Sequence, residues 1–205
     1  MPRTRTLSDD VVLERATSVF WRNGYAGTSL RHLTQATGLS NAALYHRYAH
    51  KDGLFVEVLC RYADTGLVER LARLSALPDP FEAIRDFLDE LVAMSLADPE
   101  HRGCLLVNTA LDGASMTDTA RQVVRSRLGD VETFFGALLG RAVADGALDP
   151  ETDIEAGATA LLGTVFAIRV LARLDPDAKR LRALAEHAMS GVRSFQPQQP
   201  ARQRS

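Results

Sequence analysis

Residues 24–48, Gly24-Tyr-Ala-Gly-Thr-Ser-Leu-Arg-His-Leu-Thr-Gln-Ala-Thr-Gly-Leu-Ser-Asn-Ala-Ala-Leu-Tyr-His-Arg-Tyr48, carry the pattern that decides the fold. They predict two short helices, over about 28–36 and 40–47, joined by a tight turn in which Gly38 takes the left-handed conformation. Ser40 is a favourable N-cap for the second helix. Two short helices in this relation can place the second one in the major groove of DNA.

The rest of the chain also shows apolar residues at helical spacing, interrupted by Gly, Pro and Asp. We expect an all-α protein of about nine helices. A three-helix helix-turn-helix DNA-binding domain would occupy residues 1–50, and a larger helical domain for effector binding and dimerisation would occupy 51–195. The tail 196–205 is expected to be disordered. The helices beyond the first three are expected near 51–76, 81–97, 103–112, 117–144, 154–174 and 178–195.

Charge is distributed unevenly along the chain. The formal net charge is −2, but residues 1–51 carry +4 and the remainder carries −6. A basic N-terminal part suits contact with phosphate. Arg3 and Arg5 form a basic arm that could follow the minor groove or the backbone, or could be a floppy terminus in the free protein.

Several function classes find no support in the sequence. There is no nucleotide-binding glycine loop, no metal-ligand spacing and no nucleophile motif, and the five histidines do not cluster. We therefore expect no enzyme activity, metal or cofactor. Two cysteines do not make a disulfide framework, no signal peptide precedes the first helix, and the apolar run 157–168 is too short for a membrane span. A cytoplasmic protein without membrane contact is expected.

Residues 12–54 resemble the DNA-binding domain of TetR-family transcriptional regulators. The departures are mild and concern operator sequence: Ala42 and Thr34 stand where the family often has Gly and Ala, and Arg47-Tyr48 replaces a common His-Phe pair. The resemblance implies a homodimeric repressor that binds a pseudo-palindromic operator and is released by a small-molecule signal, although activation stays open. The residues that carry it are Phe20, Gly24-Tyr25, Thr28-Ser29, Leu33, Ala36, Gly38-Leu39-Ser40, Leu44-Tyr45, Tyr48, Lys51-Asp52 and Leu54-Phe55.

The second helix of the motif should present its first turn to the bases. Asn41 can read adenine bidentately, or can be an ordinary first-turn residue. Ala42 and Ala43 permit close approach and could touch a thymine methyl group. Arg31 could reach a phosphate or a base edge, or be a solvated charge. Five residues are expected to contact phosphates: Thr28, Ser40, Tyr45, His46 and Lys51. Tyr45 could instead be a core aromatic, and Lys51 could be an exposed side chain without a contact.

The helix expected at 154–174 is apolar nearly all round and therefore has to be buried on two sides. A dimer interface with the helix that follows would supply the second side; burial within one chain is the alternative. Small or apolar residues that fit such an interface are Ala160, Gly163, Thr164, Ala167, Leu181, Leu184 and Ala188.

An effector pocket is expected in the C-terminal domain, although core packing is the alternative for each of its residues. Residues 102–111 are similar to a branch of the family that includes electrophile-sensing regulators related to NemR. Cys104, near a helix N-terminus and beside His101 and Arg102, could be a reactive thiolate or a small buried hydrophobe. The candidate pocket and sensor residues are Cys104, Phe87, Leu91, Met94, Val107, Asn108, Phe134 and Phe166.

Overall fold

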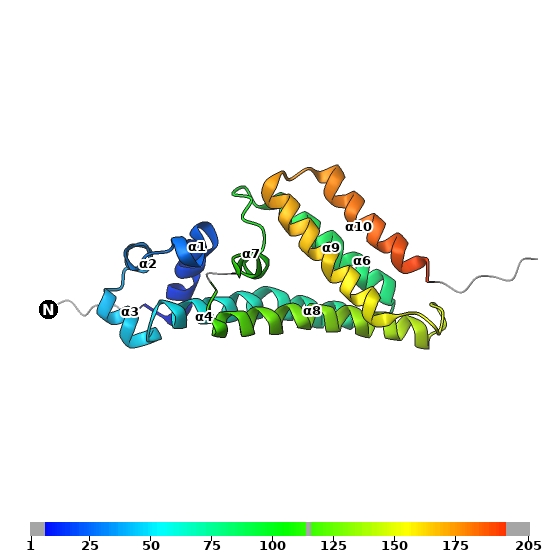
Figure 1. Cartoon of the computed structure of the whole chain (residues 1–205), viewed down its shortest axis with the longest axis horizontal. Coiled ribbons are helices and arrows are strands. Elements are labelled where there is room, and N and C mark those ends of the chain that lie inside the picture. The colour runs from blue at the N-terminus through cyan, green and yellow to red at the C-terminus, as the bar shows by residue number, and fades with distance from the viewer. Residues whose placement is uncertain (1–6, 114–115, 196–205) are drawn as a thin grey trace, which may run out of the picture. The chain divides into compact units, whose positions relative to one another are not determined.

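The computed structural model describes residues 7–113 and 116–195 (Figure 1). The expected arm residues Arg3 and Arg5 and the tail 196–205 lie outside the described residues. The helices are α1 (Asp9–Gly27), α2 (Leu30–Thr37), α3 (Asn41–Tyr48), α4 (Lys51–Tyr62), the π-helical η1 (Ala63–Val68), α5 (Glu69–Ser75), α6 (Pro80–Ala97), α7 (Leu105–Leu111), α8 (Asp118–Ala144), α9 (Ile154–Leu174) and α10 (Ala178–Arg193). The all-α prediction is confirmed, and no strand occurs in the described ranges.

The predicted helix over 51–76 is continuous in extent but not uniform in geometry. It runs through α4, η1 and α5, with a six-residue π-helical segment in the middle. Within that segment the Thr65 hydroxyl donates to the Arg61 carbonyl at 2.8 Å.

The chain divides into two compact units. The head unit comprises residues up to Glu69 together with Arg102–Leu128, and the body unit comprises Arg70–His101 together with residues from Gly129 onward. The packing therefore does not follow the expected boundary at residue 50. Buried side chains of α4, among them Leu54 and Phe55, complete the core around α1, and this keeps α4 with the helices that precede it.

The head core is built around Phe20 of α1. Its ring lies 4.7 Å from that of Phe55, centroid to centroid. Leu33 of α2 and Leu44 of α3 are buried in the same cluster. Gly24 adopts φ 68° and ψ 175° inside the assigned span of α1, a conformation that glycine reaches without strain. Gly24 thus marks a break in helical geometry, after which the chain turns toward α2.

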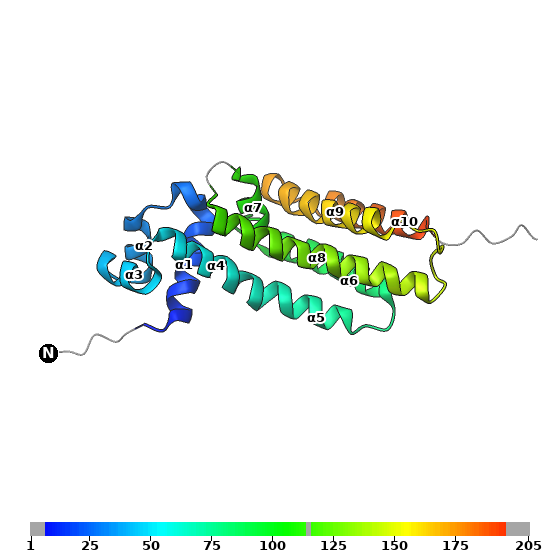
Figure 2. The ribbon, with the colours of Figure 1, turned by 60° about the horizontal axis from the view of Figure 1, so that its bottom comes forward.

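The body unit is a layer of packed helices. Figures 1 and 2 both show α6 and α9 side by side with α10 alongside them, and the three helices pack pairwise. An aromatic cluster joins α6 to the C-terminal half of α8: the Phe87 ring centroid lies 5.5 Å from that of Phe134 and 5.1 Å from that of Phe135. Aspartate N-caps begin α6, α9 and α10, as the dipole and the free amides favour.

Helix α9 is the one helix in the described part of the chain that is long and apolar enough to cross a membrane, judged by length and composition alone. The apolar run 157–168 lies within this helix, which extends to 21 residues. Only a third of its most apolar window is buried. The helix therefore carries an apolar face that its own chain leaves uncovered.

Candidate DNA-binding surface and effector domain

The turn between α2 and α3 is fixed by local hydrogen bonds. Gly38 closes α2 in the left-handed region, at φ 73° and ψ 8°. Ser40 then accepts a bond from the Ala43 amide at 3.2 Å, as expected of an N-cap. At the other end of α2, Ser29 and His32 form a reciprocal capping box. These bonds fix the turn through which the chain passes from α2 into α3.

The outer face of α3 is open to solvent. Leu44 faces the core and is 4% exposed, whereas Asn41, Ala42 and His46 are exposed and Ala43 is half-buried. Tyr45 is 42% exposed and meets the His50 ring edge-on at 5.7 Å. The alternative of Tyr45 as a core aromatic is therefore excluded.

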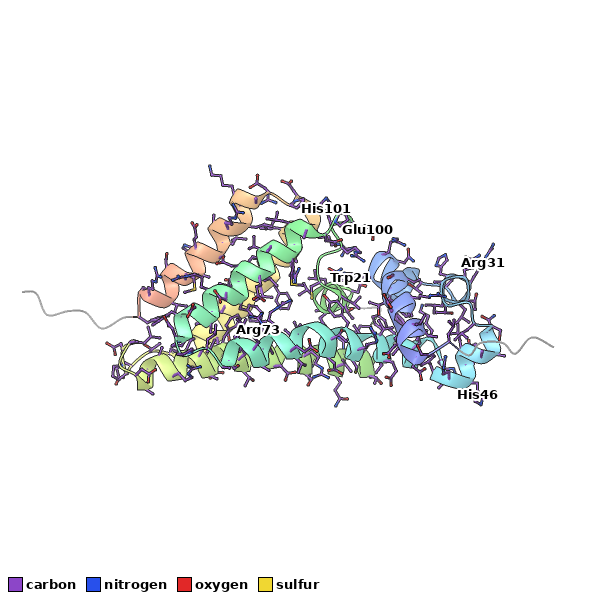
Figure 3. The ribbon with its side chains drawn as sticks, turned by 180° about the vertical axis from the view of Figure 1, so that it is seen from behind. Trp21, Arg31, His46, Arg73, Glu100 and His101 are labelled. Atoms are coloured by element: carbon purple, nitrogen blue, oxygen red, sulfur yellow. The ribbon has the colours of Figure 1, made fainter. Side chains whose placement is uncertain are left out.

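Figure 3 shows Arg31 on α2 and His46 on α3 projecting from the head unit. Both side chains are exposed. The two helices thus expose a guanidinium and an imidazole on the head unit. A surface of this kind can meet a phosphate backbone without first breaking internal contacts.

The hydroxyl of Thr28 is not part of this surface. Thr28 is 1% exposed, and its hydroxyl donates to the Gly24 carbonyl at 2.7 Å. The predicted phosphate contact by Thr28 is therefore corrected: the side chain holds the turn after α1 together. A polar residue that directly follows a helix can serve either purpose, and burial decides between them.

The Lys51 side chain is partly buried and contacts an aromatic ring. Its ammonium lies 4.1 Å from the centroid of the Tyr25 ring, whose hydroxyl donates to Asp52. Burial lowers the pKa of Lys51 below its ordinary value, because a partly desolvated ammonium favours its neutral form. A phosphate docked at the start of α4 would offset this by favouring the charged form.

Sequence reasoning missed the contacts that anchor the C-terminal end of α3. Arg47 donates to the Leu7 carbonyl at 2.9 Å and pairs with Asp9 at 2.9 Å. The Tyr48 hydroxyl also donates to Asp9, at 2.7 Å. Burial, and then the Asp9 carboxylate, raise the pKa of Tyr48. Arg47 and Tyr48 are the pair that departs from the common His-Phe pattern, so that departure was the available signal.

Cys104 occupies the N-cap position of α7 rather than its first turn. It is half-buried, and the Tyr62 hydroxyl donates to its sulfur at 3.7 Å.

Trp21 of α1 contacts Arg102, two residues before Cys104. The Trp21 indole N–H donates to the Arg102 carbonyl at 3.2 Å, and the Arg102 guanidinium lies 4.4 Å from the indole centroid. Figure 3 shows Trp21 next to α7. The predicted reactivity of Cys104 stays a prediction.

The structure distributes the predicted pocket residues over both units. Cys104, Val107 and Asn108 belong to the head unit, and the remaining five belong to the body unit. Asn108 donates to the Arg102 carbonyl at 2.7 Å. Val107 is buried, at 1% exposure.

Within the body unit, one of the predicted wall residues is misplaced. Phe87, Leu91 and Phe134 are buried, and Phe166 is half-buried. Met94 is instead 44% exposed. The prediction for Met94 is therefore corrected: its sulfur accepts a bond from the Arg70 guanidinium at 2.6 Å on the outside of α6.

The uncovered face of α9 contains most of the predicted dimer residues. Ala160 and Gly163 are exposed, and Thr164, Ala167, Leu184 and Ala188 are half-buried. A groove of about 310 Å³ between α9 and α10 is lined by Ala160, Thr164 and Ala188 among others. Leu181 is an exception, because it is fully buried in the core of its own chain; its assignment to the interface is corrected.

Comparison with known proteins places this geometry in a family. Residues 12–58 match the family model described as bacterial regulatory proteins, tetR family, and residues 80–189 match the tetracyclin repressor-like C-terminal domain. The uncharacterized HTH-type transcriptional regulator YezE of Bacillus subtilis is 32% identical over 193 residues, which cover 93% of this chain and 98% of YezE. The HTH-type transcriptional repressor ComR of Escherichia coli is 26% identical, covering 89% and 88%.

A solved structure of the TetR family transcriptional regulator CifR, a cysteine mutant complexed with 26-bp operator DNA, is 34% identical to this chain with a TM-score of 0.83, covering 92% of this chain and 98% of CifR. The reduced form of E. coli NemR is 17% identical with a TM-score of 0.73. That likeness shows the fold alone and does not assign the chain to a NemR-like branch. Two family models and a relative matched along nearly its whole length show that the chain belongs to the TetR family of DNA-binding bacterial transcriptional regulators.

Proposed function

We propose that the protein is a homodimeric repressor that binds a pseudo-palindromic operator and leaves it when a small molecule binds the body unit. The observation that carries the proposal is the outer face of α3. The helix is capped by Ser40, its Leu44 side chain is buried in the head core, and Asn41, Ala42 and Tyr45 are exposed to solvent. Repression is supported by relatives such as ComR of Escherichia coli, an HTH-type transcriptional repressor. Because its target is genomic DNA, the protein acts in the cytoplasm.

Roles within the reading surface follow from side-chain chemistry. Asn41 offers one donor and one acceptor to an adenine edge, and Ala42 and Ala43 allow the helix to approach the groove closely. Arg31, Ser40, Tyr45, His46 and Lys51 contact phosphates, which position the protein without reading sequence. Residues 1–50 would thus provide reading, and residues 51–195 sensing and dimerisation.

A second copy of the chain covers the exposed face of α9. Small residues there allow two helices to approach closely, and α10 extends the same surface. Two copies related by a twofold axis present two α3 helices to successive major grooves, which doubles the few base contacts of one head. An Ala160→Asp variant should therefore be monomeric in size-exclusion chromatography with light scattering, while Ala144→Asp, at another exposed site of the body unit, should remain dimeric.

A gel-shift assay with DNA from upstream of the gene tests the reading function. Wild-type protein should bind this DNA more tightly than random duplex, and the doubly substituted Asn41→Ala, Tyr45→Ala protein should lose the preference while keeping its fold by circular dichroism. Equal binding of both DNAs by the wild type would reject the proposal in favour of a helical scaffold or an enzyme. Whether Cys104 takes part in release is tested by Cys104→Ser: operator release by electrophiles that survives the substitution rejects thiol sensing.

A further inference from the structure

The body unit buries a positive charge that the described residues do not neutralise. Arg169 lies in the apolar helix α9 and is 5% exposed. Its Nη1 donates to the Ser95 hydroxyl at 3.0 Å, and its Nε is buried without a hydrogen-bond partner. Across residues 7–113 and 116–195, no carboxylate forms an ion pair with it.

Ser95 positions the guanidinium but cannot compensate its charge. The Ser95 hydroxyl donates to the Leu91 carbonyl at 2.8 Å and accepts from Arg169, so both functions of the hydroxyl are used. Ser95 itself is 3% exposed. The only hydrogen-bond acceptor that Arg169 contacts is a neutral hydroxyl, and its Nε–H has no acceptor. Burying a charged group in this way raises the free energy of the folded state, and buried arginines are ordinarily paired with an anion.

The donors left over define the kind of group that would pair with Arg169. With Nη1 held by Ser95, the Nε edge of the guanidinium remains available. That edge offers two parallel N–H donors, one from Nε and one from Nη2, which match the two oxygens of a carboxylate. The missing partner is therefore a planar anion approaching side-on.

The surroundings of Arg169 define the rest of the molecule. Its neighbours on the buried face of α9 are Val165, Ile168 and Ala172. On α6, Ser95 follows Leu91 and Phe87 at four-residue intervals, so the three lie on one face. Phe87 belongs to the aromatic cluster with Phe134, about 12 Å along the helix from Ser95 at 1.5 Å per residue. The Arg70 guanidinium, 5.9 Å from the Phe87 ring centroid, is paired with Glu90. One unpaired positive charge at the end of an apolar helix face suits a monoanion with an apolar body.

We propose that the effector of this regulator is an apolar monocarboxylic acid whose carboxylate pairs with the Nε edge of Arg169. The inference rests on the proposed ligand-responsive function and adds the chemical class of the ligand. Ser95 is then a positioning residue, which presents the guanidinium before the acid arrives. Pairing with the carboxylate stabilises the conformation in which Ser95 holds Arg169 buried, and a ligand that favours one conformation in this way shifts the population toward it.

The test compares acids with neutral isosteres. Full-length protein is titrated with a series of monocarboxylates (hexanoate, octanoate, decanoate, benzoate and phenylacetate) and with the amide of each, and both the melting temperature and operator release are recorded. At least one acid should raise the melting temperature and release the operator, while its amide does neither. In Arg169→Met the same acid should bind about tenfold to a hundredfold more weakly, the range expected for losing a charge-assisted hydrogen-bonded pair.

The matched control is Arg173→Met, one helical turn further along α9 and exposed, which should respond to the acid as wild type does. Arg169→Met alone should melt at or above the wild-type temperature, because it removes an uncompensated charge and keeps the side-chain volume. Four results would each overturn the proposal: acids acting no better than their amides, equal acid binding by wild type and Arg169→Met, equal loss of acid binding in Arg173→Met, or a much lower melting temperature for Arg169→Met without ligand. Operator binding by Arg169→Met that matches wild type would show that the regulator function stands even if the acid proposal falls.

Discussion

Replacing Gly53 with alanine tests the close backbone contact between the end of α3 and the start of α4. Gly53 is the third residue of α4, a position where alanine is ordinarily preferred to glycine by about 1 kcal/mol. Here an added Cβ would overlap the Tyr48 carbonyl oxygen and lie 3.2 Å from the Tyr48 carbonyl carbon. Both atoms are backbone, so neither can move without shifting the end of α3. The usual sign of the substitution should therefore be reversed.

The magnitude follows from two opposing effects. Overpacking in a well-fitted site costs about 1–3 kcal/mol, and the helix propensity gained offsets about 1 kcal/mol of it. We expect Gly53→Ala to lower the free energy of unfolding by up to about 2 kcal/mol, which corresponds to a fall in Tm of up to about 8 °C for a chain of this size. Operator affinity should fall as well, because the end of α3 would shift relative to α4.

Thermal unfolding followed by circular dichroism, together with a gel shift, measures both effects. Gly129→Ala in α8 is the matched control, because a Cβ there meets no atom within 4 Å; it should raise stability by about 0.5–1 kcal/mol. A Gly53→Ala protein that is as stable as Gly129→Ala would refute the close approach between α3 and α4.

Three further predictions follow from contacts in the head unit. Tyr48→Phe should lower stability by about 0.5–1 kcal/mol at pH 7, because it loses the partly solvated bond to Asp9. The raised pKa of Tyr48 makes this contribution present below pH 10 and lost above it, so the two proteins should converge in alkaline urea titrations. Cys60 should react slowly with iodoacetamide at pH 8, since burial raises the pKa of its thiol. Ser40→Ala should cost about 1 kcal/mol in thermal melts by removing the cap on Ala43.

Each of these has a control within the same chain. Cys60 is compared, in a Cys104→Ser background, with the same protein unfolded in urea, and equal rates would contradict the protection. For the N-cap, Ser18→Ala removes an exposed hydroxyl in the middle of α1; a loss as large as that for Ser40→Ala would contradict the capping role. A stability difference between wild type and Tyr48→Phe that grows above pH 10 would contradict the assignment of that titration.

Local sequence determined much of the head. The left-handed turn at Gly38, the N-cap at Ser40 and the core position of Leu44 are all readable because each depends on neighbours within a few residues. Thr28 shows where such reading stops. Its hydroxyl could face a phosphate or the preceding turn, and only the packing that buries it to 1% exposure decides between the two.

The body unit was less predictable because its features depend on helices distant in sequence. The apolar pattern of α9 correctly indicated a helix with an uncovered face. Leu181, expected at the dimer surface, is buried within the chain, and Met94, expected in a pocket wall, is exposed. Both outcomes depend on how α6, α9 and α10 pack together. Arg169 was visible only as a charge within an apolar helix. Its partner Ser95 is 74 residues away in sequence, and no local pattern relates the two.

Footprinting of the DNA upstream of the gene tests most directly whether two copies of α3 read an operator. With wild-type protein we expect two protected half-sites related by a dyad, centred about 10 base pairs or a multiple of that apart, and protection that weakens steeply with added salt. Asn41→Ala, with its fold intact, should lose the dyad pattern. Uniform or absent protection by the wild-type dimer, or an unchanged pattern with Asn41→Ala, would contradict reading by α3.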